Sequence, residues 1–390
     1  MKPIKPIPYA TQWIDEEDIV AVAEALRSAY LTQGPLIAEF EKKVAEYCGA
    51  KYAVAVNSGT SALHIACLAA GITRGDEVIT SAITFAASAN CVLYCGGRPV
   101  FADIDPETAL IDPADIRKKI TKKTKAIIPV HFAGHPADME EINKIARENN
   151  LIVIEDAAHA IGARYRLRES NGWVKVGSCA HSDMTIFSFH AVKQLTTGEG
   201  GMVLTNNEAL YKKLILFRSH GITRDSSLFT FHLSPFPDPW YYEMQELGYN
   251  YRLTDIHCAL GLSQLKKLDK FIARRKEIAN IYDEAFSKMD NMDYLREKQG
   301  FESSRHLYII LVNNRKEVFN FLRTKANILV NVHYIPVYQH SYYQKLGYKL
   351  NLCPKAEEYY SKAISIPMFP KLTNDELHYV IEKVRQALAD

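Results

Sequence analysis

The chain has 390 residues, which is long for a single hydrophobic core and favours two domains that share one site. Its 47 basic and 45 acidic residues leave a formal net charge of +2, which favours neither nucleic acid nor a membrane surface as a partner. The start lacks the apolar core of a signal peptide, and no run of about 18 apolar residues predicts a membrane span. We therefore expect a cytoplasmic protein.

Seven cysteines are scattered through the chain without a Cys-x-x-Cys pair. An odd number of cysteines in this arrangement indicates reduced, buried thiols rather than a disulfide framework or a zinc site. No metal is expected.

Apolar runs alternate with helical patterns up to about residue 205. Strands are predicted at 52–57, 76–80, 98–103, 125–131, 151–156, 184–189 and 201–205, and helices at 61–71, 86–95 and 139–149. Strands without polar alternation, separated by helices, are typical of a largely parallel sheet covered on both faces. Ligands of such sheets bind at the carboxyl ends of the strands, where Asn57, Asp156 and Ser188 stand.

The pattern changes beyond residue 254. One long amphipathic helix, bent or broken, is predicted at 255–283, followed by a strand at 306–312, a helix at 316–326, an extended segment at 329–334 and a helix at 374–389. This pattern indicates a smaller α+β unit and divides the chain into domains 1–250 and 251–390. Segment 224–242, rich in Pro, Phe and Ser, is predicted as a long surface loop near the site.

Segment 185–201, TIFSFHAVKQLTTGEGG, places Lys193 in a turn between two apolar runs. Ser188 precedes this lysine and three glycines follow it. A primary amine on a fixed turn can form a Schiff base with a carbonyl cofactor. Pyridoxal 5'-phosphate (PLP) needs a lysine for its aldehyde and an acid for its ring nitrogen, and Asp156 ends the preceding strand. The two segments together predict a PLP site.

Each of these features also has an ordinary structural explanation. Segment 58–61 could cradle an anion or simply cap a helix. Phe85 could stack on the cofactor ring or belong to the core. Asp156 could cap a helix start, and His159, three residues later on the same helical face, could be structural. Ser188 could be an ordinary turn residue.

Several motifs occur in a characteristic order: YLTQG at 30–34, NSGTSAL at 57–63, TF at 84–85, EDAAH at 155–159, FSFHAVK at 187–193, GYNYR at 248–252 and VHYIP at 332–336. Over nearly its whole length the chain is similar to the DegT/DnrJ/EryC1/StrS sugar aminotransferase family of PLP fold type I. The resemblance implies an α/β fold, with a large domain built on a mostly parallel seven-stranded sheet and a smaller α+β C-terminal domain.

The resemblance also implies a role for each matching residue. Lys193 holds PLP and moves a proton, and Asp156 pairs with the ring nitrogen. Phe85 stacks on the ring, and His159 lies near the ring hydroxyl. The expected phosphate ligands are Ser58, Gly59, Thr60, Ser188 and Asn250, the last from the other subunit of a homodimer with shared sites. The sugar-nucleotide side is expected to be lined by Thr32, His333 and Tyr334.

By the same likeness, the enzyme transfers an amino group from L-glutamate to C4 of a UDP-linked 4-keto-6-deoxy-N-acetyl hexose, a step of pseudaminic acid biosynthesis. A UDP-4-amino-4-deoxy-L-arabinose aminotransferase, or an enzyme for another nucleotide 4-keto sugar, is the alternative. A dehydratase of the same fold has histidine in place of Lys193, and a non-catalytic regulator loses cofactor residues. Arg218 and Arg224 are the candidate ligands for the donor's carboxylate.

Overall fold

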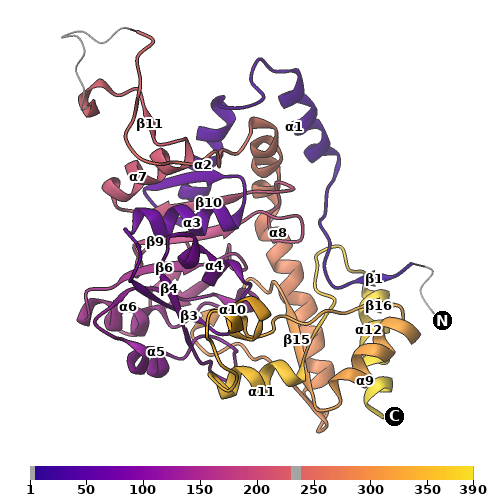
Figure 1. Ribbon diagram of the computed structural model, residues 1–390. Helices are drawn as coiled ribbons and strands as arrows, with labels where there is room; N and C mark the ends of the chain where they lie inside the picture. Colours follow the sequence, from indigo (N-terminus) through magenta and orange to yellow (C-terminus); the bar gives the residue numbers. More distant parts are fainter. Residues whose placement is uncertain (1–4, 230–238, 390) are drawn as a thin grey trace.

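A seven-stranded sheet forms the centre of the large domain (Figure 1). The computed structural model describes residues 5–229 and 239–389. The strand order is β2 (Tyr52–Val56), β10 (Gly201–Thr205), β9 (Met184–Ser188), β6 (Ile152–Asp156), β5 (Thr124–Ile128), β3 (Glu77–Ser81) and β4 (Arg98–Ala102). Only β10 runs antiparallel to its neighbours in this sheet. The predicted mostly parallel seven-stranded sheet is confirmed.

Helices cover both faces of this sheet, as unalternating apolar strands require. One face packs against α3 (Gly59–Ala69), α4 (Ala87–Tyr94) and α7 (Glu208–Arg218), and the other against α2 (Pro35–Cys48), α5 (Pro113–Lys119) and α6 (Met139–Glu148). Neighbouring residues of β9 point to opposite faces of the sheet: Ile186 packs with α3, and Phe187 packs with α2. The cysteines are free thiols, all buried except the half-buried Cys95.

The long helix α8 (Asp255–Phe286) is one continuous helix of 32 residues, so the predicted break does not occur, and a bend stays a prediction. Its first half packs in the core with α2, and its second half packs in the core of the C-terminal domain. Gly261 does not break the helix; its lack of a side chain allows α8 to approach Phe40 of α2 closely. A Cβ atom there would lie 2.7 Å from the ring of Phe40.

The C-terminal domain contains a three-stranded antiparallel sheet of β13 (Met292–Tyr294), β15 (Tyr308–Val312) and β17 (Ala363–Ile366). The helix α12 (Asn374–Ala389) lies in the same core. The helix predicted at 316–326 is α9 (Arg315–Asn320) followed by a π-helical turn at Phe321–Lys325. The smaller helices α10 (Ser341–Lys345) and α11 (Pro354–Lys362) lie beside the large domain (Figure 1). The division at residue 250 stays a prediction.

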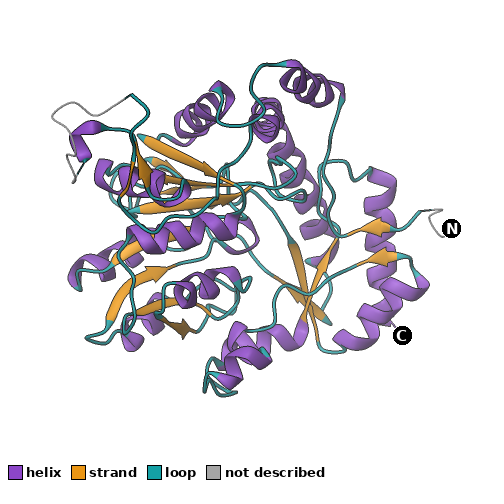
Figure 2. Cartoon of the chain, turned by 45° about the horizontal axis from the view of Figure 1, so that its top comes forward, coloured by secondary structure: helices purple, strands orange, loops and turns teal. Residues whose placement is uncertain are grey.

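The first described residues belong with the C-terminal domain. Strand β1 (Ile7–Pro8) pairs in parallel with β16 (Ile328–Leu329), and Ile7, 1% exposed, packs in that domain's core (Figure 2). The chain then crosses to α1 (Glu16–Arg27), which packs on α8.

The remaining strands form two small sheets, one of β7 (Arg164–Arg166), β8 (Trp173–Lys175) and β14 (Phe301–Glu302), the other of β11 (Ile222–Thr223) and β12 (Glu243–Met244). The predicted loop 224–242 includes a 3-10 turn at Ser226–Leu228, and its residues 230–238 lie outside the described residues. Among the residues described, no helix has the length and apolarity that crossing a membrane requires.

Candidate active site

A cavity of about 640 Å³ opens at the carboxyl ends of β2, β6 and β9. Residues 331–335, which follow β16 in the C-terminal domain, also line it. The cavity brings together ten of the predicted site residues: Ser58, Gly59, Thr60, Phe85, Asp156, His159, Ser188, Lys193, His333 and Tyr334. This is the position at which an open α/β sheet binds its ligand.

Asp156 is the last residue of β6 and is 5% exposed. Its Oδ2 accepts a hydrogen bond of 2.6 Å from Ser88 Oγ, and its Oδ1 accepts one of 3.1 Å from the N–H of Ala158. Burial raises the pKa of Asp156 above its usual value, and both hydrogen bonds oppose that rise. Turns rather than a helix follow β6, so Asp156 caps no helix, and His159 shares no helical face with it.

The residue before Asp156 fixes the position of β6. Glu155 faces away from the cavity and is 2% exposed. It accepts hydrogen bonds from Thr185 Oγ1 at 2.9 Å, from His131 Nε2 at 2.7 Å and from Ser182 Oγ. His131 Nδ1 accepts from the N–H of Ala137, so its Nε2 carries the proton donated to Glu155. These bonds tie β6 to its neighbours and thereby hold Asp156 at the cavity.

Lys193 lies in the turn between β9 and β10, and its N–H donates to the carbonyl of His190 at 2.9 Å. Burial lowers the pKa of Lys193 from 10.5 to about 8, and the nearby carboxylate of Asp156 opposes this shift. With this pKa, about a tenth of the amine is uncharged at pH 7, far more than for an ordinary lysine. The uncharged amine is the form that attacks a carbonyl group.

The start of α3 and the end of β9 approach closely. A Cβ atom at Gly59 would lie 2.9 Å from the Cβ of Ser188, and one at Gly201 would lie 2.4 Å from the carbonyl oxygen of Ser58. Ser58 is the N-cap of α3, accepting from the N–H of Ser61 at 3.1 Å, so the ordinary capping explanation holds for its side chain. The N–H groups of a first helical turn have no partner within the helix and suit an anion such as phosphate.

Phe85 is 60% exposed, so it is not a core aromatic. Its ring centroid lies 6.0 Å from that of Tyr334 across the cavity wall, at an interplanar angle of 56°. A planar aromatic ligand therefore has an open ring to stack on.

His159 and His333 are both buried in the cavity wall. His159 Nε2 lies 3.4 Å from the hydroxyl of Tyr334, and His333 Nδ1 lies 2.7 Å from Ser365 Oγ. Burial and the nearby Lys193 lower the pKa of His159 well below its usual value and that of His333 to about 4. Both imidazoles are therefore neutral at neutral pH and offer hydrogen bonds rather than charge.

Two predicted residues do not reach this cavity. Thr32 is exposed and forms a β-bridge with Thr254, and Asn250 is exposed and bridges Ser219. Neither candidate for the donor's carboxylate lies there. Arg218 donates to Glu41 Oε1 at 2.5 Å, and Arg224 does not line the cavity. The described part of segment 224–242 does not line it either.

Several residues that line the cavity or support it were not predicted from the sequence: Tyr9, Ser88, His306, Asn331 and His340. His306 lies with its ring centroid 4.3 Å from that of His159. Tyr9 and Asn331 come from segments that meet only in the folded chain. Ser88 follows Phe85 by three residues and Thr84 by four. The spacing of four residues from Thr84 is the signal that could have found it.

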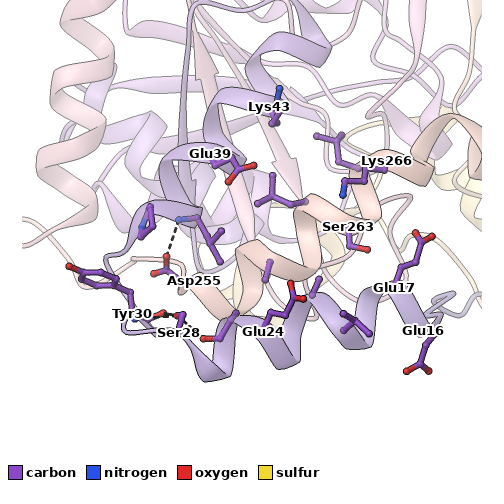
Figure 3. A pocket seen from close by; sticks show the side chains of 18 residues that line it. Glu16, Glu17, Glu24, Ser28, Tyr30, Glu39, Lys43, Asp255, Ser263 and Lys266 are labelled. Atoms are coloured by element: carbon purple, nitrogen blue, oxygen red, sulfur yellow. Dashed lines mark hydrogen bonds between the residues drawn. The ribbon is translucent and has the colours of Figure 1, made fainter.

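A second, larger hollow of about 1,100 Å³ lies between α1, α2 and α8 (Figure 3). Acidic side chains of α1 and an apolar floor line it, and Asp255 accepts hydrogen bonds from the N–H groups of Gly34 and Leu36. Neither Lys193 nor the start of α3 lines this hollow. The chemistry of a carbonyl cofactor therefore belongs to the smaller cavity.

The residues of the smaller cavity fit PLP. They offer an amine of lowered pKa, a buried carboxylate, an open aromatic ring and a helix start that approaches β9 closely. Lys193 would hold the aldehyde, Asp156 the ring nitrogen and the start of α3 the phosphate. When bound, the cofactor supplies an electron sink for the carbon that loses or gains the amino group.

Residues 12–385 match the model of the DegT/DnrJ/EryC1/StrS aminotransferase family. The chain belongs to this family. It is 41% identical to the spore coat polysaccharide biosynthesis protein SpsC of Bacillus subtilis, over 97% of this chain and 96% of SpsC. It is 40% identical to the UDP-4-amino-4,6-dideoxy-N-acetyl-beta-L-altrosamine transaminase of Campylobacter jejuni, over 97% of this chain and 99% of that enzyme.

Solved structures agree with this assignment. PseC of Helicobacter pylori, an aminotransferase involved in the biosynthesis of pseudoaminic acid, superposes with a TM-score of 0.89 at 34% identity, covering 99% of this chain and 100% of PseC. The PLP form of the putative sugar aminotransferase Spr1654 of Streptococcus pneumoniae superposes with a TM-score of 0.89 at 31% identity, covering 98% and 99%. The predicted fold and aminotransferase activity are confirmed, and PLP is the cofactor of this family.

Proposed function

We propose that this aminotransferase acts on C4 of a UDP-linked 4-keto-6-deoxy-N-acetyl hexose, with L-glutamate as the amino donor. The observation that carries the proposal is that one cavity is lined by both Lys193 and Asp156. The chain is also 40% identical, along nearly its whole length, to a UDP-4-amino-sugar transaminase. The bound cofactor would carry the amino group between the two substrates, so that glutamate would leave as 2-oxoglutarate and the 4-keto sugar would leave as the 4-amino sugar. The product belongs to the chemistry of pseudaminic acid, and the reaction takes place in the cytoplasm.

The chain's residues divide this work between the two sides of the cavity. On the sheet side, Lys193 moves the proton to and from the substrate carbon, and Asp156 keeps the ring nitrogen protonated. On the opposite side, the neutral side chains of His333 and Tyr334 offer hydrogen bonds to the sugar. Thr32 and Asn250 are proposed to serve the site across a homodimer, since both are exposed and neither lines the cavity of its own chain.

A UDP-linked 4-keto pentose, or another nucleotide 4-keto sugar, is the alternative substrate. A pentose lacks the C6 methyl and the C2 acetamido group of the hexose. In a pocket built for both, their loss costs roughly 2–5 kcal/mol of transition-state binding. That cost corresponds to a decrease of about 30-fold or more in kcat/KM.

The test is incubation of the PLP-loaded enzyme with glutamate and a panel of UDP-4-keto sugars, with products identified by mass and NMR. The proposal expects amino transfer to C4 and the highest kcat/KM for the N-acetylated 6-deoxy hexose. The matched controls are Lys193→Ala, which removes the proposed amine, and Lys213→Ala, which removes an exposed lysine of α7. Preference for the pentose would support the alternative, and activity of Lys193→Ala equal to that of the parent would contradict the proposed site.

A further inference from the structure

Gln194 follows Lys193 directly, and its side chain is 2% exposed. Lys193 lines the active-site cavity, whereas Gln194 does not. The Nε2 of Gln194 donates one hydrogen bond to the carbonyl of His159 and a second, of 2.7 Å, to Ser304 Oγ. Ser304 Oγ in turn donates to the same carbonyl at 3.0 Å. One buried amide therefore connects the turn of Lys193 to two other segments of the chain.

The position of His159 depends on these bonds. The chain forms turns rather than a helix after β6, so no helical hydrogen bonds fix the backbone there. The carbonyl of His159 accepts from both Gln194 and Ser304, while its side chain lines the cavity. The amide of Gln194 therefore links the backbone positions of two cavity residues, Lys193 and His159, without lining the cavity itself.

Ser304 gives this link a firm attachment in the C-terminal domain. It is fully buried, and its N–H donates to the carbonyl of Gly134 at 3.1 Å. A Cβ atom at Gly134 would lie 2.9 Å from Ser304 Oγ, so the two segments are in close contact. Two residues later, the carbonyl of His306 accepts from Arg275 Nη1 at 3.2 Å, which ties the segment to α8. The hydroxyl that Gln194 contacts is thus held in place by bonds that do not involve Gln194.

An amide is not the side chain that stability alone would favour at position 194. The Oε1 of Gln194 is buried and has no hydrogen-bond partner within the residues that the structure describes. A buried acceptor without a partner costs free energy, and an apolar side chain of the same length would avoid that cost. Local conflicts of this kind are expected at functional sites, where stability is given up for function.

We propose that Gln194, together with Ser304, is a positioning residue for amino transfer, which holds Lys193 and His159 in the arrangement that the cofactor needs. This assignment rests on the PLP site proposed above. Lys193 moves the proton in both half-reactions, so loss of the amide should slow both. Because Gln194 does not line the cavity, its loss should leave substrate binding nearly unchanged.

The experiment compares Gln194→Met with the parent and with Gln264→Met. Methionine keeps the length of the side chain and removes the amide. Gln264 of α8 is the matched control, because it is also 2% exposed and does not line the cavity. Its Nε2 likewise donates two hydrogen bonds, to the carbonyl of Trp13 at 3.0 Å and to Asp18 Oδ2 at 2.7 Å. Stopped-flow absorbance measures the capture of PLP by the apoenzyme and the half-reaction with L-glutamate, and chemical denaturation measures stability.

For Gln194→Met we expect the rate of PLP capture and the limiting rate of the glutamate half-reaction each to fall roughly tenfold, because small displacements of reacting groups have effects of this size or larger. The glutamate concentration that gives half of the limiting rate should stay within about twofold of the parent. Gln264→Met should lose at least as much stability and yet react at the parent's rates. Ser304→Ala removes a single oxygen atom and should repeat the pattern of Gln194→Met, so it gives a second test if Gln194→Met does not fold.

Parent rates for Gln194→Met or for Ser304→Ala, or equal losses of rate in Gln264→Met, would overturn the positioning role. A change confined to the half-saturating glutamate concentration would overturn it as well. Capture of PLP by Lys193→Ala at the parent's rate would instead overturn the proposed PLP site, and the role of Gln194 with it. A parent that captures PLP but does not react with L-glutamate would overturn the proposed donor alone, and the capture rates would still decide the role of Gln194.

Discussion

At the scale of single residues, the chemistry of the site depends on two groups of shifted pKa. The amine of Lys193 has its pKa lowered to about 8, and the buried carboxyl of Asp156 has its pKa raised. Each group opposes the shift of the other, because a carboxylate favours an ammonium group beside it. Changing one should therefore alter the titration of the other.

Capture of PLP by the apoenzyme should follow the titration of Lys193. Raising the pH removes the proton from the ammonium group, so the rate should rise about tenfold per unit at low pH and level off above about pH 8. Stopped-flow absorbance between about pH 6.5 and 9.5 measures this rate. Asp156→Asn should move the midpoint to lower pH, because it removes the charge that favours the ammonium group. A midpoint near that of an ordinary lysine would contradict the burial argument.

Ser88 should act through Asp156. Its hydroxyl donates to Asp156 Oδ2 at 2.6 Å, so Ser88→Ala should raise the pKa of Asp156 further and weaken its hold on a protonated ring nitrogen. A hydrogen bond to a charged group stabilises by about 1.5 kcal/mol, so the glutamate half-reaction should slow about tenfold. Single-turnover absorbance measures this rate, and Ser361→Ala, an exposed serine of α11, is the control. An unchanged rate would remove Ser88 from the mechanism.

At the scale of elements, the sequence was most informative where a pattern is local. Strands such as β6 and β9 were predictable because an apolar run without alternation indicates burial on both faces. The continuity of α8 was not predictable, because a glycine inside a helix weakens it. In the folded chain, Gly261 leaves room for the ring of Phe40, a contact that the sequence does not mark. Tyr9 and His306 were missed for the same reason: they reach the cavity through contacts between segments far apart in the sequence, and no local pattern marks such contacts.

Gly261→Ala should destabilise the protein although alanine is the better helix former. The added Cβ would lie 2.7 Å from the Phe40 ring and 2.8 Å from Thr197 Cγ2, in the turn that carries Lys193. Overpacking of this kind costs about 1–3 kcal/mol, against a gain of at most about 1 kcal/mol in helix propensity. Chemical denaturation measures the net loss. The exposed Lys270→Ala in the same helix should stay within about 0.5 kcal/mol of the parent. A more stable Gly261→Ala protein would show that the helix moves away from Phe40 freely.

At the scale of the whole molecule, each active site of the proposed homodimer contains residues from both chains. The exposed Asn250 would complete the phosphate site of the partner, whereas Lys193 serves its own chain. Each site would then need one intact residue from each subunit.

Mixing two inactive variants tests this arrangement. Lys193→Ala and Asn250→Ala should each have little activity alone. After co-refolding, half of the dimers should be mixed and carry one intact site each, so activity should recover to about a quarter of the parent value. Sedimentation at the assay concentration confirms the dimer. Recovery of no activity from a mixture that does contain mixed dimers would place Asn250 outside the partner's site.

The pairing of β1 with β16 also affects how the protein is made. Ile7 leaves the ribosome well before its strand partner Ile328, which follows roughly 320 residues later. At a synthesis rate of about 5–20 residues per second, the N-terminal strand waits for tens of seconds before its partner exists. The large domain can form its sheet during that time. The wall of the cavity that carries Tyr9 is therefore among the last parts of the enzyme to be completed.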